Sequence, residues 1–314
     1  MKPSGIAEPL PAGLGAHYSI VGGYDKALYA AARYGCRAVQ IFTKNASSWT
    51  ERTVTPADLI ALDQARQATG IHRILSHTAY LINLASPNDT LHQQSVSALA
   101  AELGRCEALG IDDLVMHPGA HMGTGERAGL KRVIAGIDAA MAQTPNGSVR
   151  LLLETTAGQG TGIGHSFEQL AAIIDGVSDR RRLGVCLDTC HVFAAGHDLR
   201  DAAAYERMVV ELDRLIGLDL VPVVHLNDSK HPLGSHRDRH DHIGKGELGL
   251  AGFRHILTDE RLDGMAGILE TPKSDDLHED IGNIAVLRAI ADGTPWDEIP
   301  LVGDDNGDQG AAIN

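Results

Sequence analysis

Short apolar runs rich in branched residues recur along this chain, and each is followed by a turn and a longer stretch with helical spacing. Strands that alternate with helices in this way pair in parallel. Eight such units favour a closed barrel over an open doubly wound sheet, which is the alternative. The sequence therefore predicts an α/β protein with a single-domain (β/α)8 TIM-barrel fold, whose strands are residues 14–19, 36–42, 73–77, 113–117, 149–154, 183–188, 221–226 and 266–270.

The stretches between these strands have the apolar spacing of amphipathic helices, as in residues 91–109 and 202–218. In the first of them, side chains three or four apart form one apolar stripe: Val96, Leu99, Leu103, Cys106 and Leu109. A barrel needs about 250 residues, so we assign residues 13–300 to one domain. Residues 1–12 contain three prolines, and residues 301–314 are polar and acidic, which predicts a tail at each end.

The formal net charge of −14 argues against a protein that coats nucleic acid, because neutralising phosphates takes a basic face. Two features weaken that objection. Bound divalent cations would offset carboxylate charge. In addition, four of the lysines lie after predicted strands: Lys44, Lys230, Lys245 and Lys273.

The chain carries no recognisable signal peptide and no apolar run of about 18 residues, so we expect a soluble cytoplasmic protein with no membrane contact. Its cysteines are too few for a disulfide framework in a chain of this size, and they lie in apolar or helical contexts. We therefore expect buried thiols at Cys36, Cys106, Cys186 and Cys190.

Histidines and carboxylates lie at or next to the C-terminal ends of nearly all the predicted strands: His17, His77, His117, Glu154, Asp188, His225 and Glu270. A single histidine at such a place is usually a hydrogen-bonded structural residue, and a single carboxylate often caps the next helix. In a barrel, however, these strand ends converge on one mouth, where the catalytic residues of such enzymes are found. Their recurrence on strand after strand predicts one shared site.

Imidazoles and carboxylates without a strand-end cysteine favour Zn²⁺ or Mn²⁺. The loop 230–242 adds Asp238 and His240, which are two residues apart and can chelate one ion, whereas we interpret His231, His236 and His242 as solvated side chains. Asp188 and His191, three apart across a strand-to-helix turn, can face two neighbouring ions.

Metal ions held in this way suit hydrolysis, because they lower the pKa of bound water and stabilise the oxygens of a phosphodiester. We find no nucleophile elbow, no P-loop and no dinucleotide-binding glycine motif. The glycine-rich segment 158–164 is interpreted as a flexible loop over the mouth.

At this point the chain resembles the endonuclease IV family of apurinic/apyrimidinic endonucleases, within the xylose-isomerase-like TIM barrels. The segments that carry the resemblance run in order along the chain: GAH at 15–17, FTKN at 42–45, YLINL at 80–84, HPG at 117–119, ETTAGQG at 154–160, LDTCH at 187–191, HLNDSK at 225–230, DRH at 238–240 with IGKG at 243–246, and LETP at 269–272.

The resemblance implies a monomeric DNA-repair enzyme that cuts double-stranded DNA 5′ to abasic sites and leaves a 3′-hydroxyl and a 5′-deoxyribose phosphate. It implies three zinc ions per chain, with Mn²⁺ as an alternative at one site. Their ligands would be His77, His117 and Glu154 for the first ion, Glu154, Asp188, His225 and Glu270 for the second, and His191, Asp238 and His240 for the third. The catalytic carboxylates would be Glu154, Asp188 and Glu270, around a metal-bound hydroxide.

For DNA binding the resemblance implies Lys44, Asn45, Tyr80, Leu81, Lys230 and Lys245, with Tyr80 and Leu81 entering the duplex where the abasic nucleotide is flipped out. From their residue types alone, Tyr80 and Leu81 would be ordinary loop residues. The chain departs from the family at Ser47, where an arginine that inserts into DNA is common. We therefore expect intact metal chemistry but a weaker grip on the lesion.

Two alternatives remain open. A metal-dependent sugar isomerase or epimerase can use the same barrel and similar strand-end ligands, but isomerisation needs one or two ions, and the pair Asp238 and His240 predicts a third. The other alternative is an inactive metal- or DNA-binding scaffold. The complete ligand set argues against that scaffold, and its metal content would test it.

Overall fold

The computed structural model describes residues 13–274, 277–299 and 301–303, so the predicted tail at 1–12 and most of that at 301–314 lie outside the described residues. The parallel strands close into a barrel in the order β1-β10-β7-β6-β5-β4-β3-β2, which confirms the predicted fold class. The strands are β1 (Leu14–His17), β2 (Ala38–Phe42), β3 (Arg73–His77), β4 (Asp113–Met116), β5 (Arg150–Glu154), β6 (Leu183–Asp188), β7 (Val223–His225) and β10 (Ala266–Leu269).

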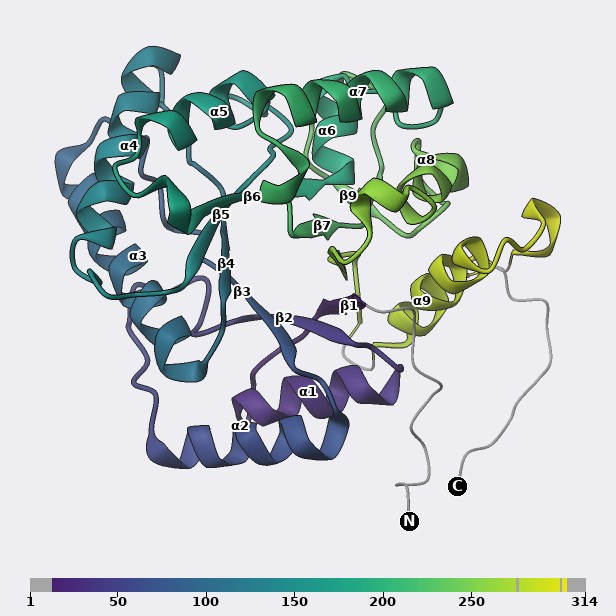
Figure 1. The fold of residues 1–314 in the computed structure, drawn as a ribbon, viewed down its shortest axis with the longest axis horizontal. Helices are drawn as coiled ribbons and strands as arrows, with labels where there is room; N and C mark the ends of the chain where they lie inside the picture. The colour runs from purple at the N-terminus through teal and green to yellow at the C-terminus, as the bar shows by residue number, and fades with distance from the viewer. Residues whose placement is uncertain (1–12, 275–276, 300, 304–314) are drawn as a thin grey trace.

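Helices surround this barrel on the outside, as Figure 1 shows. They are α1 (Tyr24–Arg33), α2 (Pro56–Thr69), α3 (Asp89–Leu109), α4 (Glu126–Met141), α5 (Phe167–Gly176), α6 (Thr189–Ala195), α7 (Ala202–Leu215), α8 (Gly249–Leu257) and α9 (His278–Ala291). Short 3-10 turns lie at η1 (Arg180–Arg182), η2 (Leu218–Leu220), η3 (Glu260–Leu262) and η4 (Trp296–Glu298). Among the described residues, no helix is both long and apolar enough to cross a membrane.

Two apolar layers hold the barrel together. The smaller lies inside the ring of strands and takes side chains from seven of them: Ala38, Leu75, Val115, Leu152, Cys186, Val223, Ala266 and Ile268. The larger fills the space between strands and helices and includes the predicted stripe of α3. Burying apolar surface is the main force that closes such a fold. All four cysteines are buried free thiols, as expected.

Two predicted helix boundaries were wrong for local reasons. Helix α3 begins two residues earlier than predicted, because the Asn88 side chain accepts a 2.9 Å hydrogen bond from the Leu91 N–H and caps the first turn. Helix α7 ends at Leu215, three residues earlier than predicted, and Gly217 with φ of +94° turns the chain into η2. Several strands are also one to three residues shorter than predicted, while β3 and β6 agree with the prediction.

One small hairpin departs from the βα repeat. After β7 the chain forms β8 (Asp228–Ser229) and β9 (His240–Asp241), which pair antiparallel. The predicted strand–helix rhythm does not contain this hairpin. The hairpin holds the two ends of the long loop 230–239 together, beside the mouth of the barrel.

Candidate metal centre

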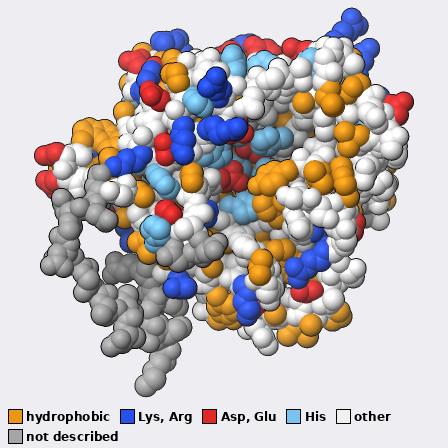
Figure 2. Space-filling model, turned by 180° about the vertical axis from the view of Figure 1, so that it is seen from behind, with side chains coloured by type: hydrophobic (Ala, Val, Ile, Leu, Met, Phe, Trp, Pro, Cys, Tyr) orange, Lys and Arg blue, Asp and Glu red, His pale blue; other side chains and the backbone are white. Residues whose placement is uncertain are grey.

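The histidines and carboxylates predicted at strand ends do come together at one mouth of the barrel. They line or adjoin a cavity of about 890 Å³ that also takes Asp238 and His240 from the loop after β7. Figure 2 shows histidine and acidic side chains at the bottom of this hollow, with lysine and arginine side chains along its edge. We call this space the main cavity.

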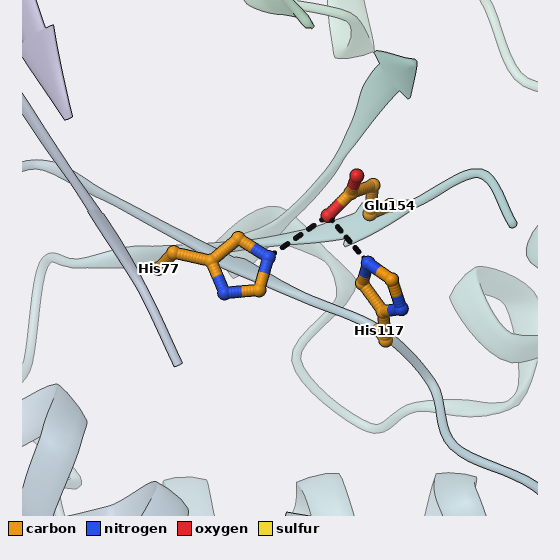
Figure 3. A group of neighbouring side chains, drawn as sticks. All are labelled: His77, His117 and Glu154. Carbon is orange, nitrogen blue, oxygen red and sulfur yellow. Dashed lines mark hydrogen bonds and ion pairs between the residues drawn. The ribbon is translucent and has the colours of Figure 1, made fainter. Parts of the chain in front are cut away.

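The first group consists of His77, His117 and Glu154, which come from β3, the end of β4 and β5. The Nε2 atoms of both histidines face the same oxygen, Oε2 of Glu154, at 2.9 and 3.0 Å (Figure 3). Glu154 is fully buried. Two imidazoles and a carboxylate that converge in this way form a set of ligands that could hold a metal ion.

The second group consists of Glu154, Asp188, His225 and Glu270. Nδ1 of His225 lies 3.1 Å from Glu154 Oε1, 3.1 Å from Glu270 Oε2 and 3.8 Å from Asp188 Oδ2. Three carboxylates around one imidazole nitrogen need a positive charge among them, which a proton or a metal ion can supply. Glu154 belongs to both groups and turns one oxygen to each.

The third group consists of His191, Asp238 and His240. Oδ1 of Asp238 lies 3.2 Å from Nε2 of His191 and 3.4 Å from Nε2 of His240. Both Nε2 atoms are buried and have no hydrogen-bond partner. Because a buried polar nitrogen without a partner is costly, these atoms fit a bound cation better than an empty site.

Four of the histidines use their other ring nitrogen to bond a protein oxygen, which orients the ring. A carbonyl oxygen can only accept a hydrogen bond, so the bonded nitrogen carries a proton and the other ring nitrogen faces the group. Metal-ligating histidines are usually fixed in this way. The bonds run from His77 Nδ1 to Thr78 O (2.8 Å), from His191 Nδ1 to Thr155 O (2.8 Å), from His240 Nδ1 to Glu270 O (3.1 Å) and from His225 Nε2 to Gln40 Oε1 (2.9 Å).

The sequence did not single out Gln40 or Asn227. Gln40 lies in the middle of β2, is fully buried, and donates to Glu270 Oε1 at 2.7 Å. Asn227 donates to Asp188 Oδ2 at 2.7 Å and accepts from the Glu270 N–H at 2.8 Å. The one available signal for Gln40 was an amide within an otherwise apolar strand.

A fourth potential group combines Asp188, Cys190 and His240. Burial raises the pKa of the Cys190 thiol to about 12, so the thiol keeps its proton at neutral pH. It donates to the carbonyl of Arg239 at 3.7 Å. The other two members, Asp188 and His240, already belong to the second and third groups, so this combination adds only the thiol to them.

The two glutamates, Glu154 and Glu270, are ionised. Burial alone would raise the pKa of Glu154, but the positive charges of His117 and His225 outweigh it and hold that pKa well below its ordinary value. The same balance, with His225 as the main positive neighbour, holds the pKa of Glu270 well below its ordinary value.

The histidines shift in the opposite direction. Burial would lower the pKa of His191, but Asp188 and the other nearby carboxylates raise it well above its ordinary value of 6.5. Burial would also lower the pKa values of His77 and His225. Neighbouring acidic groups outweigh burial, so they raise the pKa of His77 above 6.5 and that of His225 well above it. Without a metal ion these histidines therefore take up protons, and a divalent cation would compete with those protons.

Comparisons with known proteins agree with this arrangement. The sequence profile of the xylose isomerase-like TIM barrels matches residues 28–290. The "Probable endonuclease 4" of Chloroflexus aurantiacus is 47% identical over 279 residues, which are 89% of this chain and 98% of that protein. The chain belongs to the endonuclease IV family. The crystal structure of endonuclease IV from Thermus thermophilus superposes with a TM-score of 0.80 at 37% identity, and covers 90% of this chain and 100% of that one.

Sugar epimerases share the barrel but are more distant. A D-tagatose 3-epimerase-like protein superposes with a TM-score of 0.67 at 18% identity, covering 90% of this chain and 98% of that one. Likeness at this level shows the fold alone. The expected roles of the remaining side chains around the mouth therefore come from the endonuclease IV family.

Two of the residues that the family resemblance suggests for DNA binding stand at the mouth. Tyr80 is 71% exposed, and its ring packs edge-on against Phe42 with 5.1 Å between centroids. Leu81, next to it, is half-buried. Tyr80 lines the main cavity, so it is placed where a large substrate would arrive.

The β2–α2 loop carries Lys44, Asn45 and Ser47. Asn45 and Ser47 are exposed, and the Ser47 N–H donates to the Asn45 side chain at 2.9 Å. The Lys44 side chain is only 1% exposed, because its ammonium donates to the Ser48 carbonyl at 2.6 Å and pairs with Glu51 at 3.4 Å. Its charge thus stabilises the loop, and a contact between Lys44 and DNA stays a prediction.

The loop after β7 carries the remaining predicted residues. Lys230 and Lys245 are exposed. His231, His236 and His242 belong to none of the four groups formed by the described residues. His236 instead donates from Nδ1 to the Ala157 carbonyl at 3.0 Å, next to the 158–164 segment, and so fastens the two loops together.

Proposed function

We propose that this protein is a DNA-repair endonuclease that hydrolyses the phosphodiester 5′ to abasic sites in duplex DNA, leaving a 3′-hydroxyl and a 5′-deoxyribose phosphate. The observation that carries the proposal is the presence of three groups of potential metal ligands at one mouth, two of which share Glu154. Membership in the endonuclease IV family supplies the substrate class.

We propose three zinc ions per chain, one in each group, with Mn²⁺ as an alternative at one of them. The buried Nε2 atoms of His191 and His240, which share Asp238 as their acidic neighbour, and His225 Nδ1, which lies among three carboxylates, fit such ions. Bound there, the metals would lower the pKa of a water molecule and stabilise negative charge on the attacked phosphate and its leaving oxygen.

The chain's own carboxylates hold the metal groups in place and orient the attacking water. Glu154 and Asp188 are fully buried and have hydrogen bonds or ion pairs at their oxygens, so they hold the groups in place. The Glu270 side chain is 18% exposed to the main cavity, and its pKa is held well below the ordinary value, so it is ionised and accessible. We assign Glu270 the role of orienting the attacking water through a hydrogen bond to its carboxylate, because a carboxylate with so low a pKa is a weak base.

Tyr80 and Leu81 would occupy the space that the flipped nucleotide leaves in the duplex. Separating stacked bases costs a few kcal/mol, and the missing base at the lesion lowers that cost. The exposure of Tyr80 above the main cavity supports this role, because an apolar ring held at a rim is available to a duplex.

A sugar isomerase or epimerase remains the second candidate, since it shares the barrel. The third group of ligands, which isomerisation does not need, favours the nuclease. The deciding experiment incubates zinc-reconstituted protein with a duplex that carries one abasic site, and with the same duplex without it. Incision of the first duplex alone, with a 3′-hydroxyl product, is expected. No incision, especially together with ketose–aldose interconversion, would overturn the proposal.

Substitution of Ser47 tests how tightly the protein binds the lesion. A serine cannot fill a gap in the base stack or supply a charge, and Ser47 is exposed, so an arginine fits there without repacking. Ser47→Arg should therefore tighten binding of abasic duplex relative to undamaged duplex, with unchanged metal content. Equal affinity and selectivity in the two proteins would contradict this role.

A further inference from the structure

A second hollow of about 310 Å³ lies next to the main cavity. The two hollows share Tyr80, His117 and Asp238, which form the ridge between them. These side chains belong to the surface, since Tyr80 is 71% exposed and the side chains of His117 and Asp238 are 42% and 39% exposed. A chain molecule bound at the metal groups can therefore continue over the ridge into the second hollow.

The floor of the second hollow is backbone held in a fixed shape. Asn83 clamps it, donating to the Ala120 carbonyl at 3.0 Å and accepting from the Ala120 N–H at 2.9 Å. Gly119 has φ of +108°, and a Cβ there would collide with the Asn83 side-chain oxygen. Ala120 also bridges to Gly162 of the next loop. Packing against Asn83 therefore requires glycine at position 119, and it fixes the shape of this floor.

The cations around the two hollows differ in whether a carboxylate neutralises them. The lysines and arginine of the main cavity all form ion pairs: Lys44 with Glu51 (3.4 Å), Arg52 with Asp58 (3.0 Å) and Lys273 with Asp280 (3.0 Å). The second hollow is lined by Arg239. Among the described lysines and arginines that line either hollow, Arg239 alone forms no ion pair with a carboxylate of the described residues.

The backbone of Arg239 is fixed although its side chain is exposed. Its carbonyl accepts from the Lys230 N–H at 3.0 Å, at the base of the β8–β9 hairpin. Its guanidinium makes one hydrogen bond within the described part of the chain, to the Asp238 carbonyl at 2.5 Å. The remaining N–H groups are available to an anion, and the planar guanidinium matches the oxygens of a phosphate.

We propose that the second hollow is a subsite for the DNA strand beside the attacked phosphodiester, and that Arg239 binds a backbone phosphate there. This inference rests on the proposed nuclease function. It adds a phosphate contact outside the metal groups. In a protein whose formal net charge is −14, such a contact matters, because the lysines and the arginine that line the main cavity are already paired with carboxylates.

Arg239→Ala is compared with Arg237→Ala, which removes an exposed arginine of the same loop that lines neither hollow. Zinc-reconstituted proteins are titrated with a duplex carrying a non-cleavable abasic analogue, over a range of salt concentrations. Loss of one phosphate contact should weaken binding by Arg239→Ala about five- to tenfold at 0.1 M salt and reduce the salt slope by about one. Arg237→Ala should stay within about twofold of the unsubstituted protein.

Gln159→Glu provides an independent variant. Gln159 lines the same hollow, and its Oε1 accepts from the Asp238 N–H at 3.1 Å, a bond that glutamate keeps. The added negative charge should repel the phosphate and weaken binding several-fold, with unchanged zinc content. Unchanged affinity in both variants, an equal loss in Arg237→Ala, or a loss of zinc that accounts for the weaker binding would each overturn the subsite.

Failure of the subsite differs visibly from failure of the proposed function. A backbone contact acts on any duplex, so Arg239→Ala should also weaken binding of undamaged DNA. If the unsubstituted protein neither prefers nor incises abasic duplex, the proposed function fails. If it does both and Arg239→Ala binds as tightly, the subsite alone fails.

Discussion

Replacing Gln40 by leucine removes three hydrogen bonds at the floor of the main cavity. The Gln40 amide donates to Glu270 Oε1 at 2.7 Å and to His17 Nδ1 at 3.1 Å, and its oxygen accepts from His225 Nε2 at 2.9 Å. Leucine has a similar volume but no polar group. In Gln40→Leu the proton on His225 Nε2 stays buried without an acceptor, and the ring loses the contact that turns Nδ1 toward the second group.

The expected cost follows from these contacts. A buried donor without a partner costs about 1–3 kcal/mol, and a lost bond to a carboxylate costs about as much again. Glu270 is 18% exposed and keeps its contacts with His17 and His225, so its share is small. We expect Gln40→Leu to lower the free energy of unfolding of the metal-free protein by about 2–4 kcal/mol. Zinc affinity at the second group should fall about 10- to 100-fold, as when the partner of a ligating histidine is removed.

Gln169→Leu is the matched control. Gln169 is also a buried amide, and its Oε1 accepts from the Gly164 N–H at 2.7 Å and the His165 N–H at 3.2 Å, but it touches none of the metal groups. Urea unfolding in a chelator should show a loss of stability in both variants. Competition with a zinc-binding dye should show weaker zinc binding only in Gln40→Leu. Equal zinc affinity in Gln40→Leu and the unsubstituted protein would refute the orienting role.

Three further predictions follow from the same contacts. Glu154→Gln should abolish incision and reduce the zinc content by more than one ion per chain with the fold intact by circular dichroism, because Glu154 serves two groups; near-normal turnover would contradict the bridging role. Metal-free protein should unfold more easily at pH 9 than at pH 6, because the three histidines with raised pKa lose their stabilising protons as the pH rises. Because protons and zinc compete for these histidines, zinc should stabilise the fold more at pH 9 than at pH 6. Melting curves that shift equally with zinc at both pH values would contradict this competition. Arg105→Met should lower the free energy of unfolding in chemical denaturation by about 3–5 kcal/mol, because it leaves the buried Glu102 unpaired, whereas Arg181→Ala, which removes an exposed side chain, should leave the unfolding curve unchanged.

The strand-end ligands could be predicted from the sequence because a closed parallel barrel leaves little freedom in where its strand ends lie. Once eight strand–helix units are recognised, His77, Glu154, Asp188 and His225 must point into one mouth. The pairing of Asp238 with His240 could be predicted from their spacing. The side chains that hold these ligands could not, because their partners come from distant strands.

Gln40 illustrates this limit. It lies 185 residues before His225 and 230 residues before Glu270 in the chain, and its pairing with both exists only after β2 joins the closed barrel. Lys44 shows the same limit in a loop. A lysine after a strand predicts a cation at the mouth, and Lys44 does line the main cavity, but the β2–α2 loop buries its side chain against Ser48 and Glu51. Ion pairing of this kind depends on loop conformation, which local patterns do not determine.

Anomalous diffraction at the zinc edge, from crystals of the zinc-reconstituted protein, tests the metal centre most directly. Three peaks are predicted: one among His77, His117 and Glu154, one among Glu154, Asp188, His225 and Glu270, and one among His191, Asp238 and His240. Glu154 should contact the first two. A single peak, or peaks away from these groups, would contradict the assignment of a three-metal nuclease centre.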